Sequence, residues 1–528
     1  MAFLDFRKAF DTVWREGLLL AAWNSGLRGR MWRLIDALYD NVQAQVKFGN
    51  IETNFFEVAE GVKQGCVLSP VLFCIFIHEF TKMLKNHEVG SLFWADDVVL
   101  LANDENELKR MLCLAAQFAE DWKLSFNHDK SNVLVVGQRT DKNKLWKLGG
   151  KLISEVDSYK YLGVTISRNL SDHGHIHEVT KKGNRIIAYI KSVIDNFDNF
   201  NRVYYGDILW RTIALPSINY ASAVWIPGSQ SDIDKIENLQ LQMARHILKA
   251  PRNTPRAALY GDLGWVPIST IQNSFRVKYF ARILDMEFHR WPKLLMNTMT
   301  CLNTVPNKLR YKFLDCVQNI LIKCDLNDVI DCAKVGKSPR NPHWAHSIKS
   351  IIYNIFSNEW KEEALTKSSL TSYLIIKDTP CMEKYLLDAT DFHGASLKFK
   401  IRSNTLPLDS KISKWTPDND GICKLCNIDL ENVNHFLFTC KSLNTIRAEE
   451  YNNLEKELIN IDGIDIWELF ISGNLDVKYN MTLGSVNVFG NVNKAEDFYH
   501  IFDKFCKSFV KRAWKARSKL SSNATDIS

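Results

Sequence analysis

Two adjacent acids interrupt an apolar stretch near the N-terminus, and this feature constrains the fold more than any other. The stretch reads SLFWADDVVLLA over residues 91–102, with Asp96 and Asp97 at its centre. The flanking runs are aromatic or β-branched and have strand length, so they predict two short buried strands joined by a two-residue turn. Asp tolerates the left-handed backbone that such a turn can require. Two like charges beside an apolar sheet are costly, so we expect a positive group to neutralise them.

Length and composition indicate an ordinary globular protein of several domains. A chain of 528 residues exceeds one core of common size, which predicts about two to four domains. Its formal net charge of +7 is compatible with nucleic acid but weaker than in a dedicated DNA-binding module. Charged residues at positions 5, 7, 8 and 11 leave no apolar core for a signal peptide, and no run approaches the roughly 18 apolar residues of a membrane span. We expect an intracellular protein that contacts no membrane; nucleus and cytoplasm both stay open.

Strand and helix signals are mixed over about the first 170 residues. Strands are expected at 2–6, 44–49, 131–137 and 159–167, and helices at 31–42, 71–80 and 105–122. The order is not a regular β-α-β alternation, so the α+β class is expected rather than a doubly wound parallel sheet. After residue 170 helical periodicity dominates.

Five short segments carry the chemistry of this first region. In order they read FLDFRKAFDTV, GVKQGCVLSP, WADDVVLLA, LSFNHDKS and YLGV. Their order and spacing resemble the palm motifs of reverse transcriptases, specifically those of non-LTR (LINE-type) retrotransposons, over about residues 1–170. An isolated ADD would carry little weight, whereas five elements in the right order are hard to obtain by chance.

The resemblance implies a palm made of an antiparallel sheet with packed helices, and an RNA-directed DNA polymerase that works by two-metal nucleotidyl transfer. Asp5, Asp96 and Asp97 match the family's metal-binding acids, with Asp97 the less direct ligand. Carboxylate oxygens are what Mg²⁺ prefers, and two such ions can activate a primer hydroxyl and hold a triphosphate. The implied partners are an RNA template, a DNA primer and deoxynucleoside triphosphates. Oligomeric state stays open.

Four neighbouring residues also match the family pattern. Phe10 would form an aromatic gate that disfavours ribonucleotides, and this role is compatible with a place in the core. Gln64 and Gly65 lie in a turn where Gly61 and Gly65 would let backbone approach template and nucleotide closely. Lys130 would lie by the triphosphate and protonate the leaving pyrophosphate. The plainer alternatives are a core side chain for Phe10, a polar turn for Gln64 and Gly65, and a solvated lysine for Lys130.

Two departures from the pattern bear on activity. Trp94 stands where Tyr or Phe normally precedes Ala-Asp-Asp. The chain also begins shortly before Asp5, so by the resemblance it is truncated at its N-terminus and lacks fingers and an endonuclease domain. We expect impaired polymerisation. The alternative is a catalytically inactive relic or an RNA-binding scaffold, which the missing fingers favour and the retained acids disfavour.

Downstream, residues 171–260 resemble the family's thumb, 261–400 are expected to form a helical connection, and 401–528 a C-terminal domain. LPSINYASAVW (215–225) approaches a thumb pattern, and Lys181, Lys182 and Arg185 would suit phosphate contacts or a solvated helix face equally well. The helix expected at 505–520 is basic and suits nucleic-acid binding.

A cysteine and histidine cluster lies in the C-terminal domain. Cys423, Cys426, His435 and Cys440 have the spacing C-x2-C-x8-H-x4-C, which satisfies a closed tetrahedral Zn²⁺ site. Many non-LTR elements carry a similar CCHC finger in their C-terminal region. We therefore favour a structural zinc-binding module over buried free cysteines.

Overall fold

The computed structural model describes residues 1–85, 90–137, 145–196, 201–303, 311–334, 344–388, 391–490 and 494–525, the last six by their backbone alone. The chain divides into two compact units, Met1–His175 and Ile176–Ser528. Among the described residues, no helix is both long enough and apolar enough to cross a membrane.

The first unit is built on a six-stranded sheet with the strand order β6-β7-β1-β8-β10-β9. The neighbouring strands are antiparallel except for the pair β8 and β10, so the expected α+β class is confirmed. The sheet strands are β1 (Ala2–Asp5), β6 (Gly90–Trp94), β7 (Asp97–Leu101), β8 (Asn132–Val133), β9 (Trp146–Leu148) and β10 (Lys151–Glu155). The helices are α1 (Arg15–Asn24), α2 (Gly29–Tyr39), α3 (Ser69–Met83) and α4 (Glu105–Asp121).

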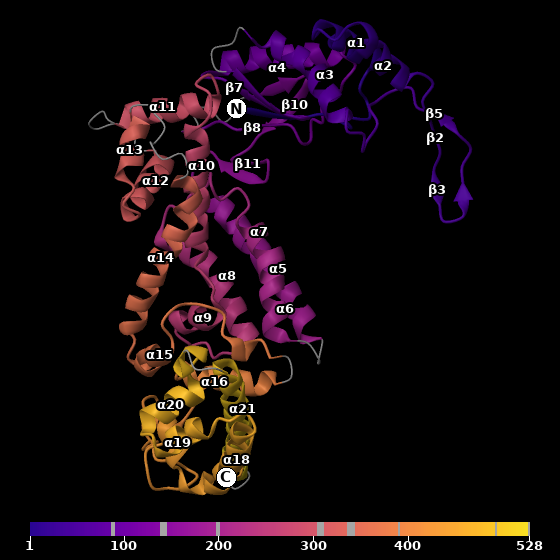
Figure 1. The fold of residues 1–528 in the computed structure, drawn as a ribbon. Helices are drawn as coiled ribbons and strands as arrows, with labels where there is room; N and C mark the ends of the chain where they lie inside the picture. The colour runs from indigo at the N-terminus through magenta and orange to yellow at the C-terminus, as the bar shows by residue number, and fades with distance from the viewer. Residues whose placement is uncertain are drawn as a thin grey trace. The chain divides into compact units, whose positions relative to one another are not determined.

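Alternation along the central strands assigns each residue to one face of the sheet. Ala2 and Leu4 of β1 belong to a large core with the helices, whereas Phe3 belongs to a small cluster on the other face. That second face is covered by a hairpin of β11 (Ser158–Tyr161) and β12 (Val164–Ser167), which contributes Tyr159 and Tyr161 to the small cluster. Figure 1 shows α3 and α4 on one side of the sheet and β11 on the other.

Several local expectations were wrong in detail. The strand expected at 44–49 is split between two small pairs, β2 (Gln43–Ala44) with β5 (Phe56–Glu57) and β3 (Lys47–Phe48) with β4 (Ile51–Glu52). The segment 131–137 contributes only β8. The segment 159–167 is the β11–β12 hairpin, which turns at Leu162 and Gly163 with φ of 45° and 81°. Short apolar runs predict extended chain but do not locate the turns within it.

The acid hairpin also differs from its expectation. β6 is the edge strand of the sheet, and its residues Leu92 and Trp94 are exposed rather than buried. The left-handed turn residue is Ala95, with φ of 53°, not an aspartate. Asp96 completes the turn, and Asp97 begins β7 opposite Trp94. Asp97 is therefore held by a strand ladder, which fixes its direction better than a turn would.

The second unit is helical in its described parts. Its helices are α5 (His173–Asp195, which begins in the first unit), α6 (Arg202–Leu209), α7 (Leu215–Ile218), α8 (Gln230–Leu248), α9 (Arg256–Leu263), α10 (Ile268–Leu284), α11 (Trp291–Asn303), α12 (Lys312–Lys323), α13 (Asn327–Lys334), α14 (Trp344–Leu365), α15 (Thr371–Ile376), α16 (Phe392–Arg402), α17 (Asp409–Ile412), α18 (Asn444–Ile459), α19 (Ile464–Ser472), α20 (Leu475–Leu483) and α21 (Ala495–Thr525). One apolar core joins α10, α12 and α14. Towards the C-terminus, α18 and α20 pack against α21 (Figure 1).

A buried ionic network ties distant parts of this unit together. The side chains of Asp262 and Arg402 are both 0% exposed and form an ion pair, with Arg402 Nε 3.0 Å from Asp262 Oδ2. Tyr373 and Tyr385 donate hydrogen bonds to the same carboxylate at 2.8 and 2.6 Å. Because the charge is paired and its oxygens are satisfied, the network tolerates complete burial.

Candidate active site and metal cluster

Asp5 and Asp97 form the centre of the candidate active site. Asp5 ends β1, Asp97 begins β7, and the antiparallel register places them directly opposite one another. Asp5 lies two residues after Phe3 and Asp97 lies two residues before Val99, and alternate residues of a strand point to the same face. Both carboxylates therefore project on the sheet face that carries the β11–β12 hairpin. The first unit thus brings together two acids that lie far apart in the sequence.

The third acid adds to an unbalanced negative charge. Burial raises the pKa of Asp97, and the charges of Asp96 and Asp5 raise it further. The negative charge also affects the tyrosines of the β11–β12 hairpin. The pKa values of Tyr159 and Tyr161 are raised mainly by burial and, in second place, by the charge of Asp97. Three carboxylates that repel one another at a half-exposed site fit divalent cations, because a cation would relieve the repulsion.

In the described part of the unit, Lys130 is the basic side chain that forms an ion pair with one of these acids. Its Nζ lies 3.9 Å from Asp5 Oδ2, and the lysine side chain is 70% exposed. An exposed pair of this kind contributes at most about 1 kcal/mol, so Lys130 does not neutralise the site. The backbone nearby is well held, since the N–H of Asp5 donates to Ser131 Oγ at 3.1 Å.

Phe10 and Gln64 lie on segments that pack against each other beside the sheet. The ring of Phe10 stacks on Phe73 with centroids 4.6 Å apart, at the border of the large core. The N–H of Val62 donates to the Phe10 carbonyl at 2.8 Å, and Gln64 Nε2 donates to Asp11 Oδ1 at 2.6 Å. The position of Gln64 is therefore set by Asp11.

The two turn glycines have different roles from each other. Gly61 has a φ of +82°, and an added Cβ would lie 2.5 Å from the Asp11 carbonyl oxygen, so this glycine accommodates the chain's own backbone. Gly65 has a φ of +79° with no atom within 4 Å of an added Cβ, so its backbone faces open space. The structure thus gives Gly61 a structural reason of its own, and the expectation that both glycines let a ligand approach stays a prediction.

Sequence reasoning overlooked three contributors to this site. Asp11 has no role in the expectations drawn from the sequence, yet it accepts the hydrogen bond that holds Gln64. Tyr159 and Tyr161 lie next to the acids, and Phe3 stacks on Tyr159 at 4.2 Å between ring centroids. The alternation in YKY places both tyrosines on one face and could have indicated this arrangement. Trp94, by contrast, is 67% exposed at the edge of the sheet.

The second unit gathers the four C-terminal cysteine and histidine residues. One ligand atom from each of Cys423, Cys426, His435 and Cys440 lies within 4.8 Å of the others. Cys423 Sγ and Cys440 Sγ are 3.9 Å apart, and Cys426 Sγ is 3.4 Å from His435 Nε2. Bond lengths to tetrahedral zinc imply about 3.8 Å between two sulfurs and about 3.5 Å between sulfur and nitrogen. The geometry therefore fits one tetrahedral metal ion.

Ionic contacts fasten the loop of this cluster to α21. Arg517 Nε and Nη2 each lie 2.7 Å from an oxygen of Glu431, and Nη2 also lies 3.0 Å from Asp409 Oδ2. Both carboxylates are fully buried. Burial raises the pKa of the Cys423 thiol to about 12.

Lys181, Lys182 and Arg185 are exposed on α5. Exposure is compatible both with phosphate contacts and with a solvated helix face, so it does not decide between these two interpretations.

Residues 1–166 match the family model described as reverse transcriptase (RNA-dependent DNA polymerase). These residues belong to the reverse transcriptase family. The reverse transcriptase domain thus contains Asp5, Asp97 and the hairpin that faces them. The match supports a nucleotidyltransferase assignment for this domain.

Relatives confirm the resemblance of this chain to the LINE-type, non-LTR retrotransposon enzymes. The RNA-directed DNA polymerase from mobile element jockey of Drosophila melanogaster is 27% identical over 293 residues, which cover 53% of this chain and 32% of the relative. A Pol polyprotein from type-1 retrotransposable element R2 of Popillia japonica is 30% identical over 182 residues, or 31% of this chain and 30% of the relative. The chain spans about a third of the length of these relatives.

Proposed function

We propose that this chain is an RNA-directed DNA polymerase of a non-LTR retrotransposon, which extends a DNA primer on an RNA template. The observation that carries the proposal is the direct opposition of Asp5 and Asp97, with Asp96 beside them, inside a domain of the reverse transcriptase family. This arrangement supplies carboxylates from two adjacent strands at one place. Nucleotidyl transfer by two divalent ions needs such a set.

Asp5, Asp96 and Asp97 would hold the divalent cations, for which Mg²⁺ is the proposed identity. When bound, the ions activate the primer 3′-hydroxyl and neutralise the triphosphate and the leaving pyrophosphate. The strand ladder fixes the direction of Asp5 and Asp97 before any ligand arrives. Lys130, 3.9 Å from Asp5 and mostly exposed, is free to turn towards a triphosphate and to donate a proton to pyrophosphate.

The remaining positions of the site would orient the substrate. We assign Phe10 to the deoxyribose, since its ring is held by Phe73 at the border of the core. Gln64 and Gly65 would contact template and nucleotide, with Gln64 positioned by Asp11 and the Gly65 backbone facing open space. Residues 171–260 would serve as thumb, 261–400 as connection and 401–528 as a zinc-stabilised domain in which Cys423, Cys426, His435 and Cys440 hold a structural ion.

Primer extension by the full chain tests this function. On a primed RNA template with Mg²⁺, we expect slow extension, in line with the impaired polymerisation expected from the sequence, and a further fall of at least about 100-fold in Asp97→Asn, because several kcal/mol of charge stabilisation are lost. The control Asp36→Asn changes an exposed acid on α2 in the same unit and should leave the rate unchanged.

The scaffold alternative predicts a different pattern. Under this alternative, the chain binds primed template in a salt-sensitive manner but extends it at no measurable rate, and both substitutions have the same effect. This result would overturn the polymerase proposal. That outcome would favour an RNA-binding scaffold or a relic.

A further inference from the structure

A basic pocket lies in the second unit where α5 and α8 end, with a volume of ≈ 820 Å³. We refer to it as the α5–α8 pocket. Among the residues that the structure describes, its lining includes the permanent cations Lys191, Arg202, Arg245, Lys249 and Arg252 and one carboxylate, Asp195. Counted over these described residues, five positive charges against one negative charge leave a surplus of +4 in a single concave surface.

The one carboxylate is already occupied by neighbouring groups. Arg202 Nη1 lies 2.5 Å from Asp195 Oδ1, and His246 Nε2 lies 3.2 Å from Asp195 Oδ2. Arg202 is held further by the His246 carbonyl, to which its Nε donates at 3.2 Å. Arg202 therefore belongs to a closed local network and shapes the wall of the pocket.

The other four cations have no such neutralisation. Within the described residues, Lys191, Arg245, Lys249 and Arg252 form no ion pair with a carboxylate at 4.0 Å or less. Arg245 Nε is buried and has no hydrogen-bond partner there. Lys249 and Arg252 are exposed. Arg245 lies in the last turn of α8, Lys249 is the left-handed residue with φ of 48° that ends this helix, and Arg252 lies in the loop that follows; all three line the pocket.

The helix ends reduce this surplus only in part. α5 ends at Asp195 and α8 at Leu248, and each C-terminus carries roughly half a negative charge from its dipole. Two such ends remove about one unit, which leaves about +3. A positive field of this size in a concavity attracts an anion with several negative charges more strongly than scattered surface lysines do.

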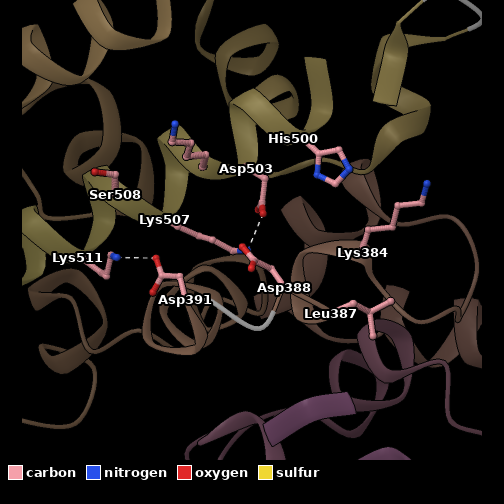
Figure 2. A pocket seen from close by; sticks show the side chains of 10 residues that line it. Lys384, Leu387, Asp388, Asp391, His500, Asp503, Lys507, Ser508 and Lys511 are labelled. Carbon is pink, nitrogen blue, oxygen red and sulfur yellow. Dashed lines mark hydrogen bonds and ion pairs between the residues drawn. The ribbon is translucent and has the colours of Figure 1, made fainter. Parts of the chain in front are cut away.

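A second pocket in the same unit shows what a self-neutralised basic surface looks like. It has a volume of ≈ 920 Å³ and is also rich in lysine. Figure 2 shows its Lys507 directed at Asp388 and its Lys511 directed at Asp391, with separations of 3.2 and 2.6 Å. Its lysines serve the chain's own carboxylates, whereas those of the α5–α8 pocket are available to a ligand.

We propose that the α5–α8 pocket binds successive phosphate groups of a nucleic-acid strand. That the ligand is a nucleic acid rests on the proposed polymerase function, whereas the charge surplus is independent of it. The volume lies within the roughly 300–1,000 Å³ of ligand pockets, enough for a nucleotide unit. Arginine and lysine contacts to phosphate position a strand without reading its sequence.

Binding of a fluorescent single-stranded RNA to the full chain tests this pocket, without nucleotides or Mg²⁺ so that polymerisation plays no part. The double variant Lys249→Glu, Arg252→Glu alters two exposed side chains and so preserves the fold. We expect it to weaken binding at least about 10-fold at ~0.1 M salt and to reduce the slope of log K against log salt by about 0.7 per lost contact. The matched control Lys361→Glu, Lys367→Glu makes the same charge change at exposed sites of this unit and should leave both quantities unchanged.

Two outcomes would overturn the proposal. One is equal weakening by both double variants, since only net charge would then matter. The other is displacement of the RNA by inorganic triphosphate at equal phosphate concentration regardless of RNA length, which would assign the pocket to small anions. If the wild-type chain binds RNA through this pocket yet extends no primer, the polymerase function fails while the inference stands.

Discussion

Asp5 and Asp97 lie directly opposite one another in the β1–β7 pair, with a further carboxylate, Asp96, in the adjoining turn. Like charges that face each other across two strands destabilise a sheet. The protein therefore retains an arrangement that costs folding free energy, and a divalent cation would relieve that cost.

Removing one of these charges should stabilise the metal-free protein. In the presence of a chelator, we expect Asp97→Asn to raise the melting temperature of the first unit by about 1–3 °C, from roughly 0.2–1 kcal/mol of relieved repulsion. Millimolar Mg²⁺ should then stabilise the wild type more than the variant. Calorimetry of both proteins with Asp36→Asn as control measures this. A lower melting temperature of Asp97→Asn in chelator would contradict the electrostatic account.

Phe10 allows a test that separates a sugar gate from a core residue. We expect Phe10→Val to increase ribonucleotide incorporation relative to deoxynucleotide incorporation, because the ring that would exclude a 2′-hydroxyl is gone. Phe73→Leu, which removes the stacking partner 4.6 Å away, serves as the packing control. The ratio of kcat/KM for the two sugars is the measurement. Loss of stability with an unchanged ratio in Phe10→Val would leave Phe10 a core residue only.

The cysteine and histidine cluster predicts one tightly bound zinc ion per chain. Cys440→Ser should abolish stoichiometric zinc and destabilise the C-terminal helices, since a structural site contributes its binding energy to folding. Metal analysis and limited proteolysis provide the readouts. Cys113→Ser, an exposed thiol on α4, is the matched control. Full zinc content in Cys440→Ser would refute the tetrahedral assignment.

The buried Asp262 predicts a particular acid sensitivity of the second unit. Burial opposes ionisation, but the charges of Arg402 and Lys377 and the hydrogen bonds from Arg402 and Tyr385 together outweigh it and keep the pKa of Asp262 below its ordinary value of 3.8. A folded-state pKa below the unfolded one contributes stability that is present above pH ~4 and is lost as pH falls through the lower value. Asp262→Asn should cost about 3–5 kcal/mol at neutral pH and flatten the acid dependence.

Urea unfolding between acid and neutral pH measures both effects, with the exposed Asp418→Asn as control. An Asp262→Asn protein that equals the wild type in stability at neutral pH would show that the ion pair is not required.

Local pattern was enough to predict much of the first unit. The helices α3 and α4 were expected within a few residues, because apolar spacing and capping residues act over one or two turns. Strand ends were predicted poorly, since pairing with distant strands sets them. That is why residues 131–137 contribute only Asn132–Val133 to the sheet.

The sequence by itself determined which residue types carry the chemistry: the acid pair after an apolar strand, and the cysteine and histidine spacing. Both are local, because ligands close in sequence can meet through short loops. Only the tertiary structure decided that Asp5 faces Asp97 and that Arg402 closes on Asp262 across 140 positions. It also decided that, within the described part of the chain, four cations without a carboxylate partner converge where α5 and α8 end. Strand register and helix packing are set by burial of apolar faces, and no local pattern records which charges that burial brings together.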